Sequence, residues 1–385
     1  MQMKAWKIPL SDLDLGPEER NAVVGVVESG WLTLGAEVSA FEKEFAAFSG
    51  AQGAVLVSSG TAALHLACLA LGVGPGIEVI VPSLSFVASA NAVALAGGRP
   101  VFADAIGAGD FTIDPVEVEQ RITPATRGVM CMHYGGFACD MDALIDICRR
   151  HDLFLIEDAA HAPGFEWKGR ALGTLGDAGC FSFFGNKNMT TGEGGVALAR
   201  DPEVLERIRL MRSHGMTSMS WDRYIGHAWA YDVVRLGYNY RPSELTAALG
   251  RAQLVKLPSN NARRYELLER YRAHLAAVPR IDMPFGGRPG AAHLAVAVVE
   301  RADLREPLRR ALADAGIQTS VHYPPTHLFR HYRETYGYAP GDLPVTEDLA
   351  ERGITLPLHP MLTPEQVDQV CGSIAAFMSR TTVAP

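Results

Sequence analysis

The sequence lacks several features that would assign it to particular classes of protein. It has no run of about 18 or more apolar residues, so we expect no membrane span and no membrane partner. The opening MQMKAWKIPLSDLDLG has no long apolar core after its basic residues, so we expect no secretory signal. None of the six cysteines forms a C-x-x-C pair and no other metal-ligand spacing is present. We therefore predict buried thiols in a reducing cytoplasm, and no metal site.

An excess of basic charge is also missing. Asp and Glu number 43 against 35 Lys and Arg, which gives a formal net charge of −8. Neutralising nucleic-acid phosphates requires a basic surface, so nucleic acid is not the expected partner. A small anionic substrate in a local basic pocket remains compatible with this balance. The 385 residues, 48% of them hydrophobic, suffice for one large domain and a smaller one.

Short apolar runs alternate with helical patterns over the first two thirds of the chain. This alternation predicts an α/β fold whose large domain has a mostly parallel sheet with helices on both faces. The expected strands cover 54–58, 78–81, 100–103, 128–133, 153–157, 179–183 and 195–199, and helices between them include 61–71, 88–96 and 141–151.

The pattern changes near residue 239. Two long helices are expected over 242–256 and 261–277, followed by a strand candidate at 294–299 and helices at 304–315 and 364–378. This tail predicts a smaller C-terminal α+β domain. We place the boundary near residue 258, which gives a large domain over 1–258 and a small one over 259–385.

Open α/β sheets bind ligands at the carboxyl ends of their strands, and polar residues follow several of the predicted strands. The first candidate site is Ser59, Gly60 and Thr61, where a strand gives way to a helix. Free N–H groups at a helix N-terminus bind phosphate, and glycine allows close backbone approach. An ordinary helix cap is the alternative interpretation, and the motif alone leaves both open.

The second candidate site is the run IEDAAH over 156–161, where an apolar strand ends in Glu157 and Asp158, with His161 close behind. A carboxylate at a strand end can bind a cationic ligand atom or a metal. It can equally belong to a buried, satisfied pair or cap a helix.

The third candidate site surrounds Lys187, in FSFFGNKNMTTGEGG from Phe181. A lysine held among aromatic, small and amide residues loses its proton easily and can act as an amine nucleophile. The alternative is a surface lysine in a glycine-rich loop. Surface lysines rarely lie in a Phe-Ser-Phe-Phe neighbourhood, so we favour a functional role.

Together the three sites are more specific than any one of them. They supply a phosphate cradle, a carboxylate and a lone lysine, with Asp158 and Lys187 29 residues apart. Pyridoxal 5'-phosphate (PLP) needs this set: a phosphate anchor, an acid partner for the pyridine nitrogen and a lysine for the Schiff base.

Motifs along nearly the whole chain resemble those of the DegT/StrS-type sugar aminotransferases, a family of fold-type-I PLP-dependent transferases. The matching segments are SGWLTLG from Ser29, SSGTAALHLA from Ser58, PSLSFVASANA from Pro82, EDAAHA from Glu157, FSFFGNKNMTTGEGG from Phe181, GYNYRPSELTAALGRAQL from Gly237, VHYPPTH from Val321 and LPLHP from Leu356.

The resemblance implies a role for each matching residue. Lys187 would hold the cofactor and move the proton, and Asp158 would pair with the pyridine nitrogen. The other implied cofactor contacts are Gly60, Thr61 and Ser182 at the phosphate, Phe86 stacked on the ring and His161 against the ring near its phenolic oxygen, where many relatives have glutamine. Asn239 would reach the phosphate of the other subunit in a homodimer with shared active sites. Thr33, His322 and Tyr323 are the implied substrate-pocket residues, although His322 and Tyr323 could equally belong to the packing of the small domain.

The resemblance implies a ping-pong transfer of an amino group from L-glutamate or L-glutamine to a keto-sugar. We expect this keto-sugar to be linked to a nucleotide. A keto-cyclitol is the main alternative acceptor. The segment 215–234 is a candidate acceptor pocket through Trp221, Asp222 and Arg223, which could equally be dimer contacts.

Three other activities are compatible with parts of the pattern. A PLP-dependent sugar dehydratase would replace the lysine with histidine, whereas this chain keeps Lys187. A non-catalytic PLP-binding regulator is disfavoured because the chain is acidic and has no recognisable DNA-binding motif. A decarboxylation or aldol cleavage is not excluded by the fold.

Overall fold

The computed structural model of the protein describes residues 6–218, 221, 226 and 229–380. Its centre is a seven-stranded sheet in which one strand runs antiparallel to both neighbours and the other pairs are parallel. This confirms the predicted fold class. In order across the sheet the strands are β1 (Ala54–Val57), the antiparallel β11 (Gly195–Ala199), β10 (Ala178–Ser182), β7 (Phe154–Asp158), β6 (Thr126–Met132), β2 (Glu78–Pro82) and β3 (Arg99–Ala103).

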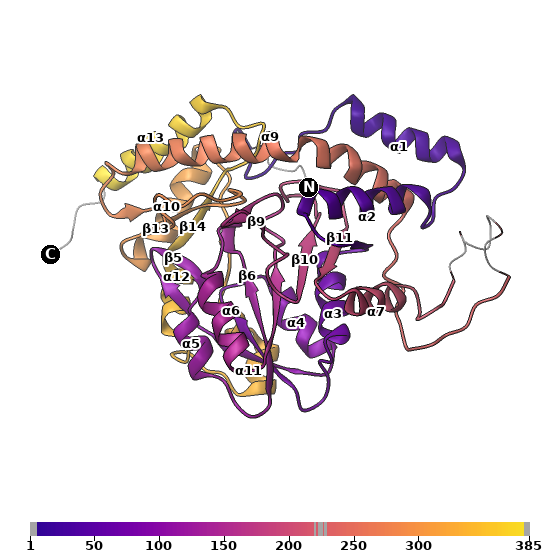
Figure 1. The fold of residues 1–385 in the computed structure, drawn as a ribbon. Coiled ribbons are helices and arrows are strands. Elements are labelled where there is room, and N and C mark those ends of the chain that lie inside the picture. The colour runs from indigo at the N-terminus through magenta and orange to yellow at the C-terminus, as the bar shows by residue number, and fades with distance from the viewer. Residues whose placement is uncertain (1–5, 219–220, 222–225, 227–228, 381–385) are drawn as a thin grey trace.

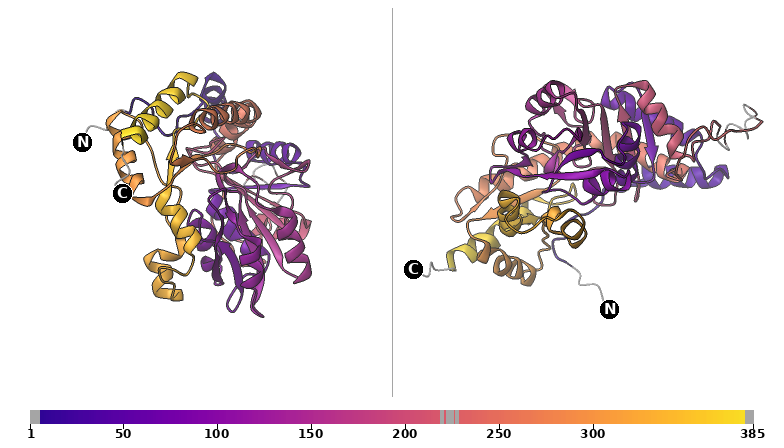
Figure 2. Two further views of the ribbon diagram at one scale, coloured as in Figure 1. Left: turned by 90° about the vertical axis from the view of Figure 1, so that its left-hand side faces the viewer. Right: turned by 90° about the horizontal axis from the view of Figure 1, so that it is seen from below.

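Helices cover both faces of this sheet, as Figures 1 and 2 show. All residues of β1 and β11 are buried, which explains why the strands appear in the sequence as continuous apolar runs. Along β1, Val55 and Val57 pack with α3 and α7, whereas Leu56 packs with α2 and α9. The helices of this part are α1 (Pro17–Ser29), α2 (Ala36–Ser49), α3 (Gly60–Ala70), α4 (Ala88–Leu95), α5 (Pro115–Gln120), α6 (Met141–Arg150) and α7 (Pro202–Arg212).

The sequence explains where several of these helices begin. The carboxylate of Asp140 accepts a hydrogen bond from the N–H of Ala143 at the start of α6 (3.1 Å), and basic residues occupy its last turn. Asp201 caps α7 in the same way, with Pro202 in the first turn, where no N–H is needed. Such caps fix the helices that flank the strand ends.

One long helix, α9 (Glu244–Leu275), replaces the two helices expected over 242–256 and 261–277. Pro258 lies inside it, although proline disfavours a helix interior. Buried side chains on both sides of Pro258 explain the outcome: Leu254 and Leu257 pack under α2, and Leu267 and Leu268 pack in the C-terminal core. The domain boundary near residue 258 stays a prediction, and that residue lies within α9.

The C-terminal part is built on a small antiparallel sheet. Its strands are β12 (Ile281–Asp282), β13 (Ala295–Val299) and β14 (Gly353–Leu356). The helices are α10 (Ala302–Asp314), α11 (Arg330–Tyr336), α12 (Pro344–Arg352) and α13 (Pro364–Arg380). Figure 1 shows α9 running from this part to α1 and α2.

Two small hairpins, not predicted from the sequence, complete the elements named here: β4 (Ala105–Gly107) with β5 (Asp110–Ile113), and β8 (Glu166–Trp167) with β9 (Arg170–Ala171). Among the described residues, no helix is long and apolar enough to cross a membrane.

Candidate active site

A cavity of about 350 Å³ opens at the carboxyl ends of β7 and β10, which end in Asp158 and Ser182. This is the sheet edge where the sequence predicted a ligand site. Ten predicted residues line the cavity together: Ser59, Gly60, Thr61, Phe86, Asp158, His161, Ser182, Lys187, His322 and Tyr323.

The start of α3 forms one wall of the cavity. Ser59 caps the helix, because its hydroxyl accepts a hydrogen bond from the N–H of Ala62 (3.1 Å). The N–H groups of Gly60 and Thr61, in the first turn, have no partner within the helix. A Cβ on Gly60 would lie 2.7 Å from the Cβ of Ser182, so only glycine lets the helix start approach β10 this closely. The structure shows the helix cap at Ser59, and the free N–H groups beside it keep the predicted phosphate contact open.

Asp158 is buried and faces the cavity. Its carboxylate accepts a hydrogen bond from the Ser89 hydroxyl (2.8 Å) and a longer one from the N–H of Ala160 (3.2 Å). Ser89 in turn contacts the hydroxyl of Ser85 (2.9 Å), so a chain of hydroxyls orients the acid. Burial raises the pKa of Asp158, and the hydrogen bond from Ser89 and the charge of Lys187 oppose that rise.

The neighbouring Glu157 has a different role. Its carboxylate accepts hydrogen bonds from the backbone N–H groups of Gly173 (2.8 Å), Leu175 (2.7 Å) and Gly176 (2.7 Å). It also contacts Nε2 of His133 at 3.1 Å. The interpretation as a buried, satisfied carboxylate therefore holds for Glu157.

Lys187 lies in the loop after β10 and is half-buried at the cavity wall. Burial lowers the pKa of its amine to about 8, although the negative charge of Asp158 works in the opposite direction. A larger fraction of this amine is thus neutral near neutral pH than for a lysine in water.

His161 and Tyr323 form a hydrogen-bonded pair in the cavity. The N–H of Gly135 donates to Nδ1 of His161 (3.3 Å), and Nε2 lies 3.0 Å from the Tyr323 hydroxyl. Burial keeps the pKa of His161 well below its usual value, so the ring is neutral and its proton is on Nε2. The hydroxyl oxygen of Tyr323 accepts a hydrogen bond from Nε2–H of His161. The O–H of Tyr323 can therefore donate to a ligand in the cavity.

Thr33 and Asn239 do not reach this cavity within their own chain. Thr33 is exposed near the start of α2, and Asn239 is exposed and bridges to Ser213. Trp221 packs edge-on against Trp31 (5.0 Å between ring centroids), also outside the cavity. Asp222 and Arg223 lie outside the described residues.

Several cavity features were not predicted from the sequence. Ser89 holds Asp158, while Met132, Cys180 and Glu193 help to line the cavity. Ser89 follows Phe86 by three residues in the PSLSFVASANA motif, and that helical spacing is the one signal that could have found it.

Comparison with known proteins identifies the family of the chain. Residues 13–375 match the DegT/DnrJ/EryC1/StrS aminotransferase family, and the chain belongs to it. The protein is thus an aminotransferase. It is 41% identical over 381 residues to SpsC, a spore coat polysaccharide biosynthesis protein of Bacillus subtilis, with 97% of this chain and 98% of SpsC covered.

Two solved structures show the same fold over the chain's length. Spr1654 of Streptococcus pneumoniae, assigned as a sugar aminotransferase and solved in its PLP form, gives a TM-score of 0.90 at 31% identity, covering 97% of this chain and 99% of that one. PseC of Helicobacter pylori is an aminotransferase involved in the biosynthesis of pseudoaminic acid. It gives a TM-score of 0.90 at 29% identity, covering 97% of this chain and 100% of that one.

Spr1654 was solved in both its PLP and its PMP form, so pyridoxal 5'-phosphate is the group to compare with this cavity. The cavity fits it, because it combines a helix N-terminus for the phosphate, a buried carboxylate, and an amine with a lowered pKa. Phe86 lines the cavity and is 55% exposed, so part of its ring is accessible to a ligand.

Proposed function

We propose that this aminotransferase moves an amino group from L-glutamate or L-glutamine to a keto-sugar, nucleotide-linked, by a ping-pong mechanism. The observation that carries the proposal is the meeting of Lys187, Asp158 and the start of α3 in one cavity. The choice of a sugar is supported by the roles of SpsC and PseC, in polysaccharide and pseudoaminic acid biosynthesis. A keto-cyclitol is the alternative acceptor.

Each cavity residue has a proposed role. Lys187 would hold the cofactor. Once the donor's amine has replaced it there, the freed neutral amine of Lys187 would take the proton from the donor's α-carbon and pass it to the cofactor. Asp158, held by Ser89, favours a protonated pyridine nitrogen, since a nearby cation stabilises the carboxylate form of a buried acid. When bound, PLP carries the amino group and accepts the electrons of the broken C–H bond. Tyr323 presents a hydroxyl donor to the substrate.

The attachment to Lys187 has a direct chemical test. Borohydride reduction of the yellow holoenzyme should abolish its absorption band and leave a stable adduct, which peptide mapping should locate on Lys187. An adduct on any other lysine would refute the assignment while leaving the family membership intact.

The donor and acceptor can be tested in separate half-reactions. L-glutamate or L-glutamine alone should convert the enzyme to its pyridoxamine form. That form, mixed with a panel of keto-sugars and keto-cyclitols in single turnovers, should return to the PLP form fastest with the true acceptor. No conversion by any amino acid would count against transamination, and a preference for keto-cyclitols would replace the keto-sugar.

We further propose a homodimer whose active sites each contain residues of both chains. Asn239 is exposed and outside the cavity of its own chain, which suits a residue that serves a partner. The described parts of the segment between α7 and α9 extend away from the body (Figures 1 and 2). Apolar side chains on it are unusually exposed, with Trp229 at 98% and Leu236 at 82%.

A mixing experiment tests the shared site. Lys187→Ala and Asn239→Asp homodimers should each be nearly inactive, because Asn239→Asp places negative charge beside a phosphate. In a mixed dimer one site takes Lys187 from one chain and Asn239 from the other, so co-refolding an equal mixture should restore about a quarter of wild-type activity under two-fold symmetry. Heterodimers confirmed by mass that remain inactive would exclude the shared site.

A further inference from the structure

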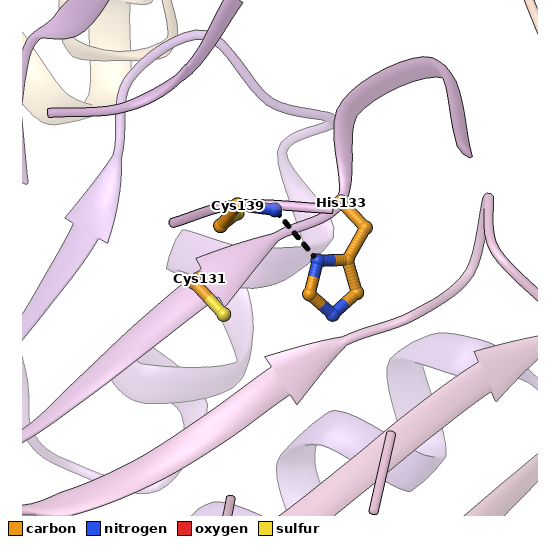
Figure 3. A group of neighbouring side chains, drawn as sticks. All are labelled: Cys131, His133 and Cys139. Atoms are coloured by element: carbon orange, nitrogen blue, oxygen red, sulfur yellow. Dashed lines mark hydrogen bonds between the residues drawn. The ribbon is translucent and has the colours of Figure 1, made fainter. Parts of the chain in front are cut away.

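A second cluster of reactive side chains lies on the opposite face of the strands that carry the active site. Cys131 and His133 lie at the end of β6, and Cys139 lies in the loop that follows (Figure 3). All three side chains are buried, and one possible ligand atom from each lies within 4.8 Å of the other two. In the strand register Cys131 pairs with Glu157, whereas the next pair, Met132 and Asp158, lines the active-site cavity.

A glycine turn brings these three residues together. After His133 the chain passes through a short 3-10 turn, η1 (Tyr134–Gly136), in which Gly135 and Gly136 have φ angles of 63° and 91°. A Cβ on Gly136 would lie 2.8 Å from the carbonyl oxygen of His161. The turn therefore requires glycine, and it folds Cys139 back onto the end of β6. The resulting spacing, C-x-H-x5-C, matches no common metal motif, so the sequence alone did not predict a site.

Both ring nitrogens of His133 have partners, and the weaker of the two contacts is at the nitrogen that would bind a metal. Nε2 contacts the carboxylate of Glu157, which already accepts three backbone N–H groups and acts as an acceptor. The proton is therefore on Nε2, and the lone pair is on Nδ1. Nδ1 accepts a long hydrogen bond from the backbone N–H of Cys139 (3.3 Å, Figure 3), and a bound ion would replace that donor at the lone pair. A carboxylate that orients a histidine through its far nitrogen is the usual outer support of a metal-binding histidine.

We propose that Cys131, His133 and Cys139 form a binding site for a thiophilic divalent cation, zinc in the first instance. Two thiolates and a neutral imidazole cancel the charge of a divalent ion, as a site inside an apolar core requires. Met141 offers a fourth soft donor, since its Sδ lies 4.0 Å from Sγ of Cys131. Zinc–sulfur bonds of about 2.3 Å place tetrahedral ligands roughly 3.8 Å apart, so the donors need only small movements.

The position of the site gives the ion a structural role. It would tie the loop of Cys139 to the end of β6, and the backbone N–H of His133 donates to the carbonyl of Asp158 (3.2 Å). An ion that binds only the folded chain raises stability by mass action. Binding would therefore restrict the motion of the end of β6, which is hydrogen-bonded to Asp158 on the neighbouring strand.

The test uses holoenzyme produced in zinc-supplemented medium, so that a buried site is loaded as the chain folds. Elemental analysis after gel filtration under reducing conditions should find one zinc per chain, and loss of zinc should lower the thermal midpoint. Protein produced with cadmium should show an ultraviolet thiolate-to-metal absorption. Cys131→Ser and Cys139→Ser should lose both signals. Cys371→Ser is the matched control, because Cys371 is a buried cysteine in α13, outside the cluster, and this variant should retain both.

Two results would overturn the site. One is wild-type holoenzyme with far less than one equivalent of metal after both kinds of loading. The other is a serine variant that retains the metal and the thermal transition of the wild type. If the serine variants do not fold, zinc-edge X-ray absorption on the wild type decides: two sulfur neighbours at about 2.3 Å support the proposal, and a shell of oxygen and nitrogen alone refutes it.

Discussion

Glu157 and Asp158 are adjacent carboxylates on one strand, yet their surroundings differ in every respect that matters for chemistry. Glu157 faces the core behind the sheet and accepts three backbone N–H groups as well as contacting His133. Asp158 faces the cavity and has one hydroxyl and one long N–H contact. Because successive strand residues point to opposite faces, one position separates an acid that is satisfied in the core from one that faces the cavity. An acid with unused acceptor capacity is the one that can serve a ligand.

The sharpest test of this comparison is Asp158→Asn. The amide cannot favour a protonated pyridine nitrogen as a carboxylate does, so kcat should fall by about 10² to 10⁴, the range typical for losing a proton-handling group. The circular dichroism spectrum and thermal midpoint should stay close to the wild type. A variant that turns over at nearly the normal rate would show that Asp158 is structural like its neighbour.

A second test of the cavity face is the pKa of the Lys187 amine. In cofactor-free protein, competitive labelling with acetic anhydride across a pH series should show half-maximal reactivity of Lys187 near pH 8, far below the usual value of 10.5 for lysine. The neutral amine is the reactive form, so labelling rises with pH. In Asp158→Asn the midpoint should move lower still, because the lost carboxylate favoured the ammonium form. A midpoint near 10.5 would contradict the buried setting.

Glu157→Gln tests the other side of the comparison. In the glutamine variant an NH₂ group replaces one carboxylate oxygen, so some of the buried backbone N–H groups lose their acceptor. This loss should lower the free energy of unfolding by about 2–4 kcal/mol. Urea unfolding measures this loss, and kcat per folded molecule should be largely retained. A large loss of kcat with unchanged stability would mean that the two carboxylates had been assigned the wrong way round.

The smallest effect is expected for Tyr323→Phe, which removes the hydroxyl that His161 orients. One hydrogen bond to substrate contributes about 1 kcal/mol, so kcat/KM for one half-reaction should fall roughly five- to tenfold while cofactor loading persists. Comparing the donor and acceptor half-reactions identifies which substrate uses the hydroxyl. If the variant matched the wild-type rate in both half-reactions, Tyr323 would be assigned to packing. Burial raises the pKa of this tyrosine, so its hydroxyl is protonated in both half-reactions.

The sequence by itself determined the frame of the protein. All seven strands of the central sheet were predicted within two residues at each end, because strands buried on both faces appear as uninterrupted apolar runs. The polar residues after them, from Gly60 to Lys187, fell where parallel strands end, so the cavity could be anticipated as well. The motifs also carried the family, which the comparison with known proteins confirmed.

Only the tertiary structure decided which of these residues meet. Packing on both sides of Pro258 made one helix where local propensity indicated two. The glycine turn at Gly135 and Gly136 placed Cys139 against His133, which no spacing rule predicted. Strand alternation in a fixed register set Asp158 toward the cavity and Glu157 away from it. These outcomes depend on contacts between residues far apart in the chain, and a local pattern contains no information about which distant surface will cover it.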